Sequence, residues 1–146
     1  MEISLELENT LPAYESARER LEVLFRDGGV APDTANELEL IVEEVLVNIV
    51  NHAYPAPGEG RVQVDASVDA SAVTLVFRDE GAPFDPLARD EPDIDAPFEN
   101  RPIGGLGIFL TTELASRVMY ERRDGSNVLT VVKLLAGGAH DAKENP

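Results

Sequence analysis

The chain has 146 residues with 28 acidic and 12 basic side chains, which give a formal net charge of −16. This length suits one domain with one hydrophobic core, and the excess of acid argues against direct binding to nucleic acid, whose phosphates need a basic surface. Cysteine is absent, which excludes disulfides and thiolate metal sites. The sequence shows neither a run of ~20 apolar residues nor a signal-peptide pattern, so we expect no membrane partner and a cytoplasmic location.

The chain is predicted to begin with a strand and a helix. Ile3, Leu5 and Leu7 alternate with polar residues, which is the period-two pattern of a half-buried strand. Apolar residues at helical spacing then predict a helix from about residue 13 to residue 27, which Gly28 ends.

The next helix is predicted to run from Pro32 to about His52. Asp33 is expected to be its N-cap, because a short carboxylate there accepts hydrogen bonds from the free N–H groups of the first turn. Apolar residues at helical spacing form a wide stripe on this helix, which must face a core. That stripe consists of Leu38, Ile41, Val42, Val45, Leu46, Ile49, Val50 and Ala53.

The middle of the chain combines two strands, a long loop and a third helix. Strands are predicted over residues 62–68 and 73–77, and the short link between them indicates a hairpin. Residues 80–104 contain five prolines, which excludes a continuous helix or strand. So long a segment without regular structure favours a functional loop. The third helix is expected from Leu106 to about Arg117.

The last predicted elements are strands at residues 118–122 and 128–135, joined by an Asp-Gly turn at 124–125 that is typical of a hairpin. Residues 137–146 are expected to form a flexible tail beyond a single domain of residues 1–136. The order β-α-α-β-β-loop-α-β-β predicts an α+β fold. We expect a two-layer sandwich, with a mostly antiparallel mixed sheet and about three helices on one face.

Glu44 and Asn48 are the first candidate site residues. They are four residues apart on the second helix and therefore lie about 40° apart on one face, one turn from each other. Carboxylate and amide oxygens suit Mg²⁺, and a carboxylate can also act as a general base. Taken alone, the pair equally fits the solvated face of an amphipathic helix.

The turn that starts with Asp79 and contains Gly81 directly follows a predicted strand. An aspartate at this position can accept a hydrogen bond from an exocyclic amine such as that of adenine, and a glycine lets a flat ring approach the backbone. The alternative is an ordinary turn, because both residue types favour turns.

A glycine-rich stretch, Gly104-Gly105-Leu106-Gly107, stands where the third helix begins. Backbone N–H groups at a helix N-terminus can bind phosphate, so these residues are candidates for a phosphate site. The alternative is a flexible hinge. The spacing matches neither the P-loop nor the dinucleotide-binding fingerprint.

In their order and spacing, these three segments resemble the boxes of the GHKL ATPase superfamily, which includes gyrase, heat-shock chaperone, histidine kinase and mismatch-repair ATPases. Residues 43–54 are similar to its N-box, residues 79–86 to its Asp-x-Gly box and residues 104–108 to its second glycine box. The chain looks most like the anti-sigma factor serine kinases of bacterial partner-switching systems. The resemblance covers about residues 3–135 and implies a Bergerat-type ATP-binding fold.

The resemblance implies a role for each box. Glu44 would be the general base that activates a serine hydroxyl, Asn48 would bind Mg²⁺, and Asp79 would bind the adenine of ATP with Gly81 beside it. A lid over residues 85–107 would place Gly104, Gly105, Leu106 and Gly107 at the phosphates.

The resemblance also implies partners. The substrate would be a serine on a small anti-sigma factor antagonist, the protein would otherwise sequester a sigma factor or another target, and it would be a homodimer. Arg101 and Thr130 stay open as candidates for contacts with phosphate and adenine. Two other functions are weighed beside the kinase: ATP-dependent binding of a protein without phosphoryl transfer, and simple ATP hydrolysis.

Overall fold

The computed structural model describes residues 1–56, 58–83, 85–88 and 105–135 of the chain. Residue 84 and residues 89–104 of the loop expected over 80–104, and the tail expected over 137–146, lie outside these residues. The elements are β1 (Glu2–Glu8), α1 (Leu11–Asp27), α2 (Pro32–His52), β2 (Arg61–Val68), β3 (Ala72–Asp79), the 3-10 helix η1 (Pro86–Ala88), α3 (Gly105–Leu114), β4 (Arg117–Arg123) and β5 (Ser126–Leu134).

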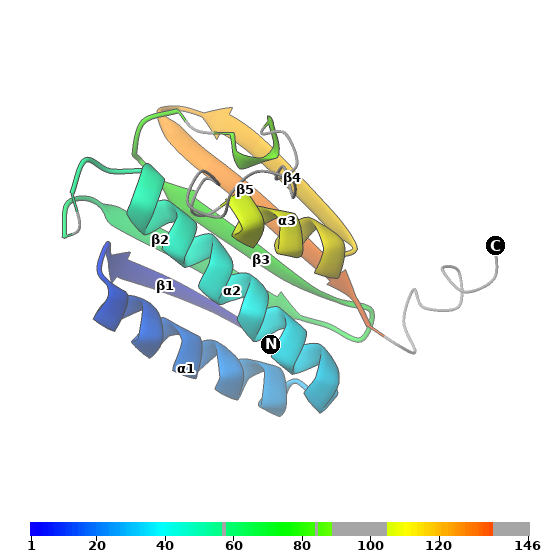
Figure 1. Ribbon diagram of the computed structural model, residues 1–146. Helices are drawn as coiled ribbons and strands as arrows, with labels where there is room; N and C mark the ends of the chain where they lie inside the picture. Colours follow the sequence, from blue (N-terminus) through cyan, green and yellow to red (C-terminus); the bar gives the residue numbers. More distant parts are fainter. Residues whose placement is uncertain (57, 84, 89–104, 136–146) are drawn as a thin grey trace.

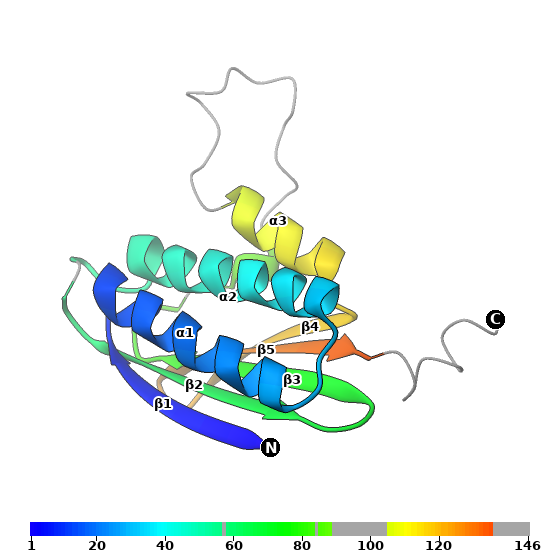
Figure 2. The ribbon, with the colours of Figure 1, turned by 90° about the horizontal axis from the view of Figure 1, so that it is seen from below.

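The strands form one five-stranded sheet in the order β1-β2-β3-β5-β4, and every pairing is antiparallel. The three α-helices all cover one face of this sheet, and α3 lies on α2 (Figures 1 and 2). The predicted α+β two-layer sandwich is therefore confirmed. No helix in the described residues is both long and apolar enough to cross a bilayer.

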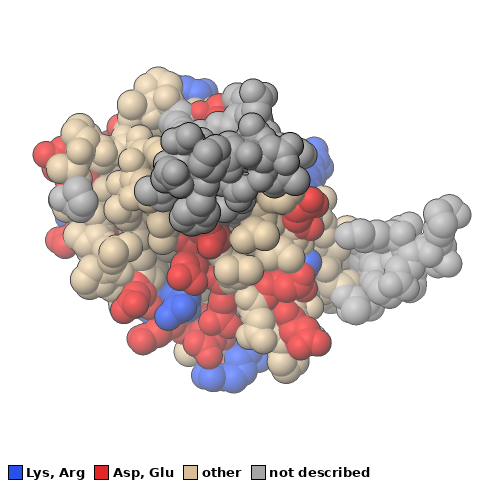
Figure 3. Space-filling view, viewed as in Figure 1, with Lys and Arg blue, Asp and Glu red and all other residues tan. Residues whose placement is uncertain are grey.

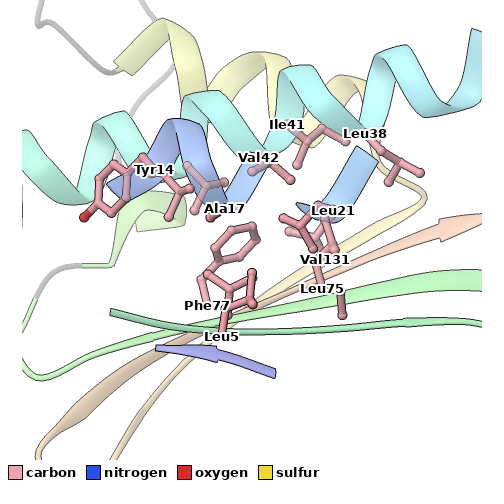
Figure 4. Close-up of a cluster of buried hydrophobic side chains, with 14 of the residues drawn as sticks. Leu5, Tyr14, Ala17, Leu21, Leu38, Ile41, Val42, Leu75, Phe77 and Val131 are labelled. Carbon is pink, nitrogen blue, oxygen red and sulfur yellow. The ribbon is translucent and has the colours of Figure 1, made fainter. Parts of the chain in front are cut away.

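The core lies between α1, α2 and the sheet (Figure 4). Alternate strand residues point to it: Phe77 of β3 pairs with Val64 of β2 and with Leu129 of β5, and all three are buried. Burying a side chain such as Phe77 stabilises the fold by about 1.5–3 kcal/mol. The apolar stripe predicted for the second helix supplies the other side of the core, mainly through Leu38 and Ile41.

Three local predictions differ from the structure at helix ends. The N-cap of α2 is Ala31, which makes no side-chain cap, so the prediction of Asp33 as N-cap is wrong. Pro32 occupies the start of α2, which shifts Asp33 into the first turn, where its charge favours the helix dipole. Helix α1 starts two residues earlier than expected, capped by Thr10, whose Oγ accepts a hydrogen bond from the N–H of Ala13.

The third helix ends at Leu114, three residues before its predicted end. Its continuation is prevented because the N–H of Ser116 already donates to the carbonyl of Val132 on β5, at 2.9 Å. The hairpin predicted at residues 124–125 is confirmed, since Asp124 and Gly125 have φ values of 50° and 80°, as a type I′ turn requires.

Candidate active site

Asn48 is a buried polar residue on the site-facing side of α2. Only 3% of its surface is exposed, and its Oδ1 atom has no hydrogen-bond partner among the described residues. A solvated helix face would not bury an amide, so that alternative does not hold for Asn48. An unsatisfied buried amide oxygen costs about 1–3 kcal/mol, a cost that a bound ligand or water could offset.

Glu44 lies one helical turn before Asn48 and is partly exposed. Partial burial raises the pKa of its carboxyl group, and the neighbouring charge of Glu43 raises it further. In the described part of the chain, no side chain donates a hydrogen bond to this carboxylate. A carboxylate with a raised pKa and a free acceptor face is suited to accept a proton.

A small cavity of about 30 Å³ lies between α2 and the sheet. Its polar lining residues come from distant parts of the chain and are Asn48, Asp79, Tyr120 and Asn127. Its apolar lining residues are Val45, Ile49, Phe77, Pro86 and Leu129. The structure therefore brings Asn48 of the second helix and Asp79 to one cavity, whose lining does not include Glu44 or Gly81. Apolar walls with a few polar groups are typical of the lining of a small-molecule site, but the volume is near that of one water molecule and well below the ~300 Å³ of such a site, so a base would need more room than this cavity has.

Asp79 is the last residue of β3, and only 6% of its surface is exposed. Its Oδ1 atom accepts two hydrogen bonds of 2.9 Å, from the N–H of Gly81 and from Nδ2 of Asn127. Burial raises the pKa of this carboxyl group, while these two hydrogen bonds and the charge of Arg122 oppose the rise. A buried carboxylate that is only partly satisfied can still accept a hydrogen bond from an amine.

Gly81 lies against the C-terminal end of α2. A Cβ atom at this position would be 2.0 Å from the carbonyl oxygen of Ala53, so no other residue fits without a backbone shift. The same carbonyl accepts a hydrogen bond of 3.0 Å from the N–H of Ala82. Packing against the helix therefore requires this glycine, independently of any contact with a base.

Tyr54 connects the same turn to β2. Its hydroxyl donates to the carbonyl of Arg61, at 2.6 Å, and accepts from the N–H of Glu80, at 2.8 Å. Gly60 packs directly on its ring, where any Cβ atom would overlap it. The turn that follows Asp79 is thus fixed by the end of α2 and by β2.

The β4–β5 hairpin contributes residues that the sequence patterns did not single out. Asn127 lies opposite Asp79 in the sheet, and Arg122 donates a 2.8 Å hydrogen bond to the carbonyl of Gly81. A period-two count from the core residue Leu129 places Asn127 on the buried face, which was the available signal. The same count places Thr130 on the opposite face, so Thr130 is excluded as a neighbour of Asp79.

The first turn of α3 contains Gly105, Leu106 and Gly107. This turn lies beside the C-terminal half of α2, which is the half that carries Glu44 and Asn48 (Figures 1 and 2). Helix N-termini present free N–H groups, so the backbone here suits phosphate. Gly104 and Arg101 lie outside the described residues, and their roles stay predictions.

The donor set fits Mg²⁺ bound together with a nucleotide rather than a metal held by the protein alone. Among the described residues, no three His, Cys, Asp or Glu side chains cluster to hold a metal ion. Mg²⁺ in nucleotide sites usually has one or two protein ligands, with phosphates and waters completing the shell. The Oδ1 atom of Asn48, which has no hydrogen-bond partner among the described residues, could serve as such a ligand.

Comparison with known proteins identifies the family of the chain. Residues 7–133 match the family described as the histidine kinase-like ATPase domain. The chain is 30% identical to the serine/threonine-protein kinase BtrW of Bordetella bronchiseptica, over 74% of this chain and 72% of that protein. It is 27% identical to the serine-protein kinase RsbW of Listeria monocytogenes, over 81% of this chain and 78% of that protein. The resemblance expected from the three boxes is confirmed.

Solved structures show the same fold. The RsbU and RsbW domains of Rv1364c from Mycobacterium tuberculosis align with a TM-score of 0.67 at 16% identity, over 94% of this chain but only 34% of that one. The histidine kinase domain of the Erythrobacter litoralis EL346 blue-light activated histidine kinase aligns with a TM-score of 0.50 at 17% identity, over 88% of this chain and 63% of that one. At these identities the likeness concerns the fold alone.

Proposed function

The chain belongs to the family of histidine kinase-like ATPase domains, among the anti-sigma factor serine kinases, and we propose that it transfers phosphate from ATP to a serine of a small anti-sigma factor antagonist. The observation that carries this proposal is the position of Glu44, a carboxylate with a raised pKa, one turn from the unsatisfied buried amide of Asn48. The first supplies a base and the second a metal ligand on one helix face.

Each residue has a proposed role in the transfer. Asp79 binds the exocyclic amine of adenine, with Gly81 shaping the turn beside it. Bound Mg²⁺ would neutralise charge on the phosphates, and Asn48 would be one of its ligands. Glu44 accepts the proton of the serine hydroxyl as the oxygen forms its bond to the γ-phosphorus and the bond to ADP breaks. Such a base typically contributes ~10²- to 10⁴-fold to the rate.

Gly104, Gly105, Leu106 and Gly107 are proposed to bind the phosphates through backbone N–H groups. Three of these residues, Gly105, Leu106 and Gly107, form the first turn of α3, where free N–H groups are available, and this position supports the proposal. Closure of this region over Mg-ATP would exclude water from the transfer, which favours phosphorylation of a hydroxyl over hydrolysis.

The proposed partners are the serine-bearing antagonist, a sigma factor or other regulatory target, and a second copy of the chain, in the cytoplasm. Supporting a protein partner, a groove of about 300 Å³ between α1 and α2 is lined by apolar side chains of Leu11, Leu46 and Val47. Three charged residues, Glu15, Arg18 and Glu43, also line the groove, and acidic side chains predominate over basic ones on the face of the molecule in Figure 3. Its nearness in sequence to Glu44 makes it a candidate substrate-docking surface.

The proposal is tested by incubating the purified protein with labelled ATP, Mg²⁺ and the cognate antagonist. We expect phosphoserine on the antagonist and loss of the product when Mg²⁺ is chelated. The antagonist can be identified by pull-down with and without ATP. Intact ATP binding without any transfer would reject the kinase and leave the alternative, an ATP-dependent binding module.

A further inference from the structure

Asn127 lines the cavity, and both polar atoms of its side chain make hydrogen bonds. Only 5% of its surface is exposed. Its Nδ2 atom donates to Oδ1 of Asp79, at 2.9 Å, and to the carbonyl of Ala82, at 2.8 Å. Its Oδ1 atom accepts from the Tyr120 hydroxyl, at 2.5 Å, and from Nη1 of Arg122, at 3.2 Å.

These four contacts permit only one orientation of the amide. Rotating it by 180° would place its oxygen against the Asp79 carboxylate and the Ala82 carbonyl, both of which only accept hydrogen bonds. Nη1 of Arg122, which only donates, would then face an NH₂ group, so the contacts with Asp79, Ala82 and Arg122 would be lost, whereas the Tyr120 hydroxyl can accept as well as donate. Arg122 and the carbonyl of Ala82 therefore determine that Asn127 presents a donor to Asp79.

The consequence falls on Asp79. Both hydrogen bonds that reach its carboxylate from the described residues bind Oδ1, one from Asn127 and one from the N–H of Gly81. This leaves Oδ2 as the acceptor for a ligand in the cavity that Asp79 lines. A carboxylate fixed in this way attracts a base that presents an amine and repels one that presents a carbonyl oxygen at the same place.

We infer that Asn127, oriented by Arg122 and the carbonyl of Ala82, is a positioning residue that sets the base specificity of the pocket, favouring adenine over guanine. The inference rests on the proposed binding of ATP, but it concerns selection of the base and not phosphoryl transfer. Asn127 acts through Asp79 and through the backbone of Ala82, which it also holds.

Asn127 also affects the protonation of Asp79, which must be ionised to accept a hydrogen bond from an amine. The titratable groups that act on it are Arg122 from β4, Tyr14 from α1 and Tyr54 after α2. Both tyrosines have raised pKa values and are neutral at physiological pH, so Arg122 is the one charge among these groups. The hydrogen bond from Asn127 lowers the pKa of Asp79 and so opposes the effect of burial. Without this donor the pKa would be higher, and the carboxylate would protonate at higher pH.

The test compares equilibrium affinities for Mg-ATP and Mg-GTP in the wild type and in Asn127→Leu, Asn127→Thr and Tyr120→Phe. We expect Asn127→Leu to weaken ATP about 10-fold with little change for GTP, the loss typical of one hydrogen bond to a charged group. Asn127→Thr keeps a short donor and should recover part of the preference. Tyr120→Phe, which keeps the ring, should reduce the preference by a smaller factor of about 3.

A second readout is the pH dependence of ATP affinity. Asp79 binds an amine as the carboxylate, so affinity falls as pH drops through its pKa, and this fall should move to higher pH in Asn127→Leu. Thr130→Val is the matched control, since Thr130 is on the same strand but on the opposite face. Equal weakening of ATP and GTP in Asn127→Leu, or a wild type without preference for ATP, would overturn the inference, whether or not the protein transfers phosphate.

Discussion

The two ends of the proposed nucleotide site are built differently. At the base end, Asp79 and Asn127 are buried near the ends of the inner strands β3 and β5, and they are joined by hydrogen bonds that also hold Gly81 and Ala82. At the phosphate end, Glu44 is partly exposed on a helix, and no described side chain donates a hydrogen bond to it. The base end is thus rigid before a ligand arrives, while the phosphate end is open to a protein substrate.

This difference separates recognition from chemistry. A base is recognised best by groups that lose no freedom when it binds, which the sheet provides. A general base for a serine on another protein must be reachable from solvent, which the helix provides. Substitutions at the two ends should therefore have different effects, and the following predictions test that separation in order of decreasing effect.

Glu44→Gln should reduce phosphoryl transfer by ~10²-fold or more, because the amide cannot accept the serine proton. ATP affinity should change less than about 2-fold, since Glu44 lies outside the base cavity. Transfer is measured as phosphoserine under single-turnover conditions, and binding by calorimetry. Partner capture that depends on ATP should persist in this variant. If transfer continued at the wild-type rate, Glu44 would not be the base.

Asp79→Asn should weaken ATP binding by about 10- to 100-fold, because the charged acceptor for the adenine amine is lost from a buried site. At saturating ATP, the rate of transfer should recover to a large extent, since the phosphate end is unchanged. Steady-state kinetics over a wide ATP range would show a raised KM with a similar kcat. A lowered kcat at unchanged KM would contradict the separation of the two ends.

Gly81→Ala should destabilise the fold by about 2 kcal/mol, because the added methyl group meets the carbonyl of Ala53. Urea unfolding measures this change, and Ala82→Ser serves as the control because Ala82 is exposed and its neighbour carries the close contact. A stability equal to that of the wild type would mean that the turn and the end of α2 can move apart freely.

Tyr54→Phe should lower the stability by about 1 kcal/mol through loss of the hydroxyl that bridges Arg61 and Glu80. The effect is smaller than that of Gly81→Ala, since the ring and its packing on Gly60 remain. Thermal unfolding followed by circular dichroism would detect it. An increase in stability would show that the bridge is strained and does not support the turn.

Glu43→Gln should give the smallest effect, a shift of the acid limb of the transfer rate to lower pH. The charge of Glu43 raises the pKa of Glu44, so its removal lowers that pKa and keeps the base ionised in more acidic solution. The shift should shrink at high salt because both groups are partly exposed. Glu39→Gln, whose charge does not act on Glu44, is the control, and an identical shift in both variants would refute the local effect.

The local pattern of the chain predicted most of the fold. Patterns among neighbouring residues predicted the apolar stripe of α2, the alternation of the strands and the Asp-Gly turn of the last hairpin. Each of these is confirmed. The errors fall at helix ends, where a single contact decides: Pro32 displaced Asp33 from the cap of α2, and pairing of Ser116 with β5 ended α3.

The sequence predicted the residues proposed to contact the nucleotide, but not the residues that hold them in place. Glu44, Asn48, Asp79 and Gly81 carry signals in their spacing and in the family resemblance. Nothing local connects Asn127 to Asp79, which is 48 residues away. Thr130, which stayed open as a contact to adenine, lies on the other face of β5, because one position along a strand changes the face.

The sequence by itself determined the order of the elements, the buried faces and the identity of the boxes, because periodicity and residue type act over a few neighbours. Only the tertiary structure decided that β5 lies between β3 and β4, which places Asn127 opposite Asp79. It also decided that Gly81 meets the carbonyl of Ala53. Both contacts join distant segments, and such pairings follow from how the layers pack and not from any one stretch of the chain.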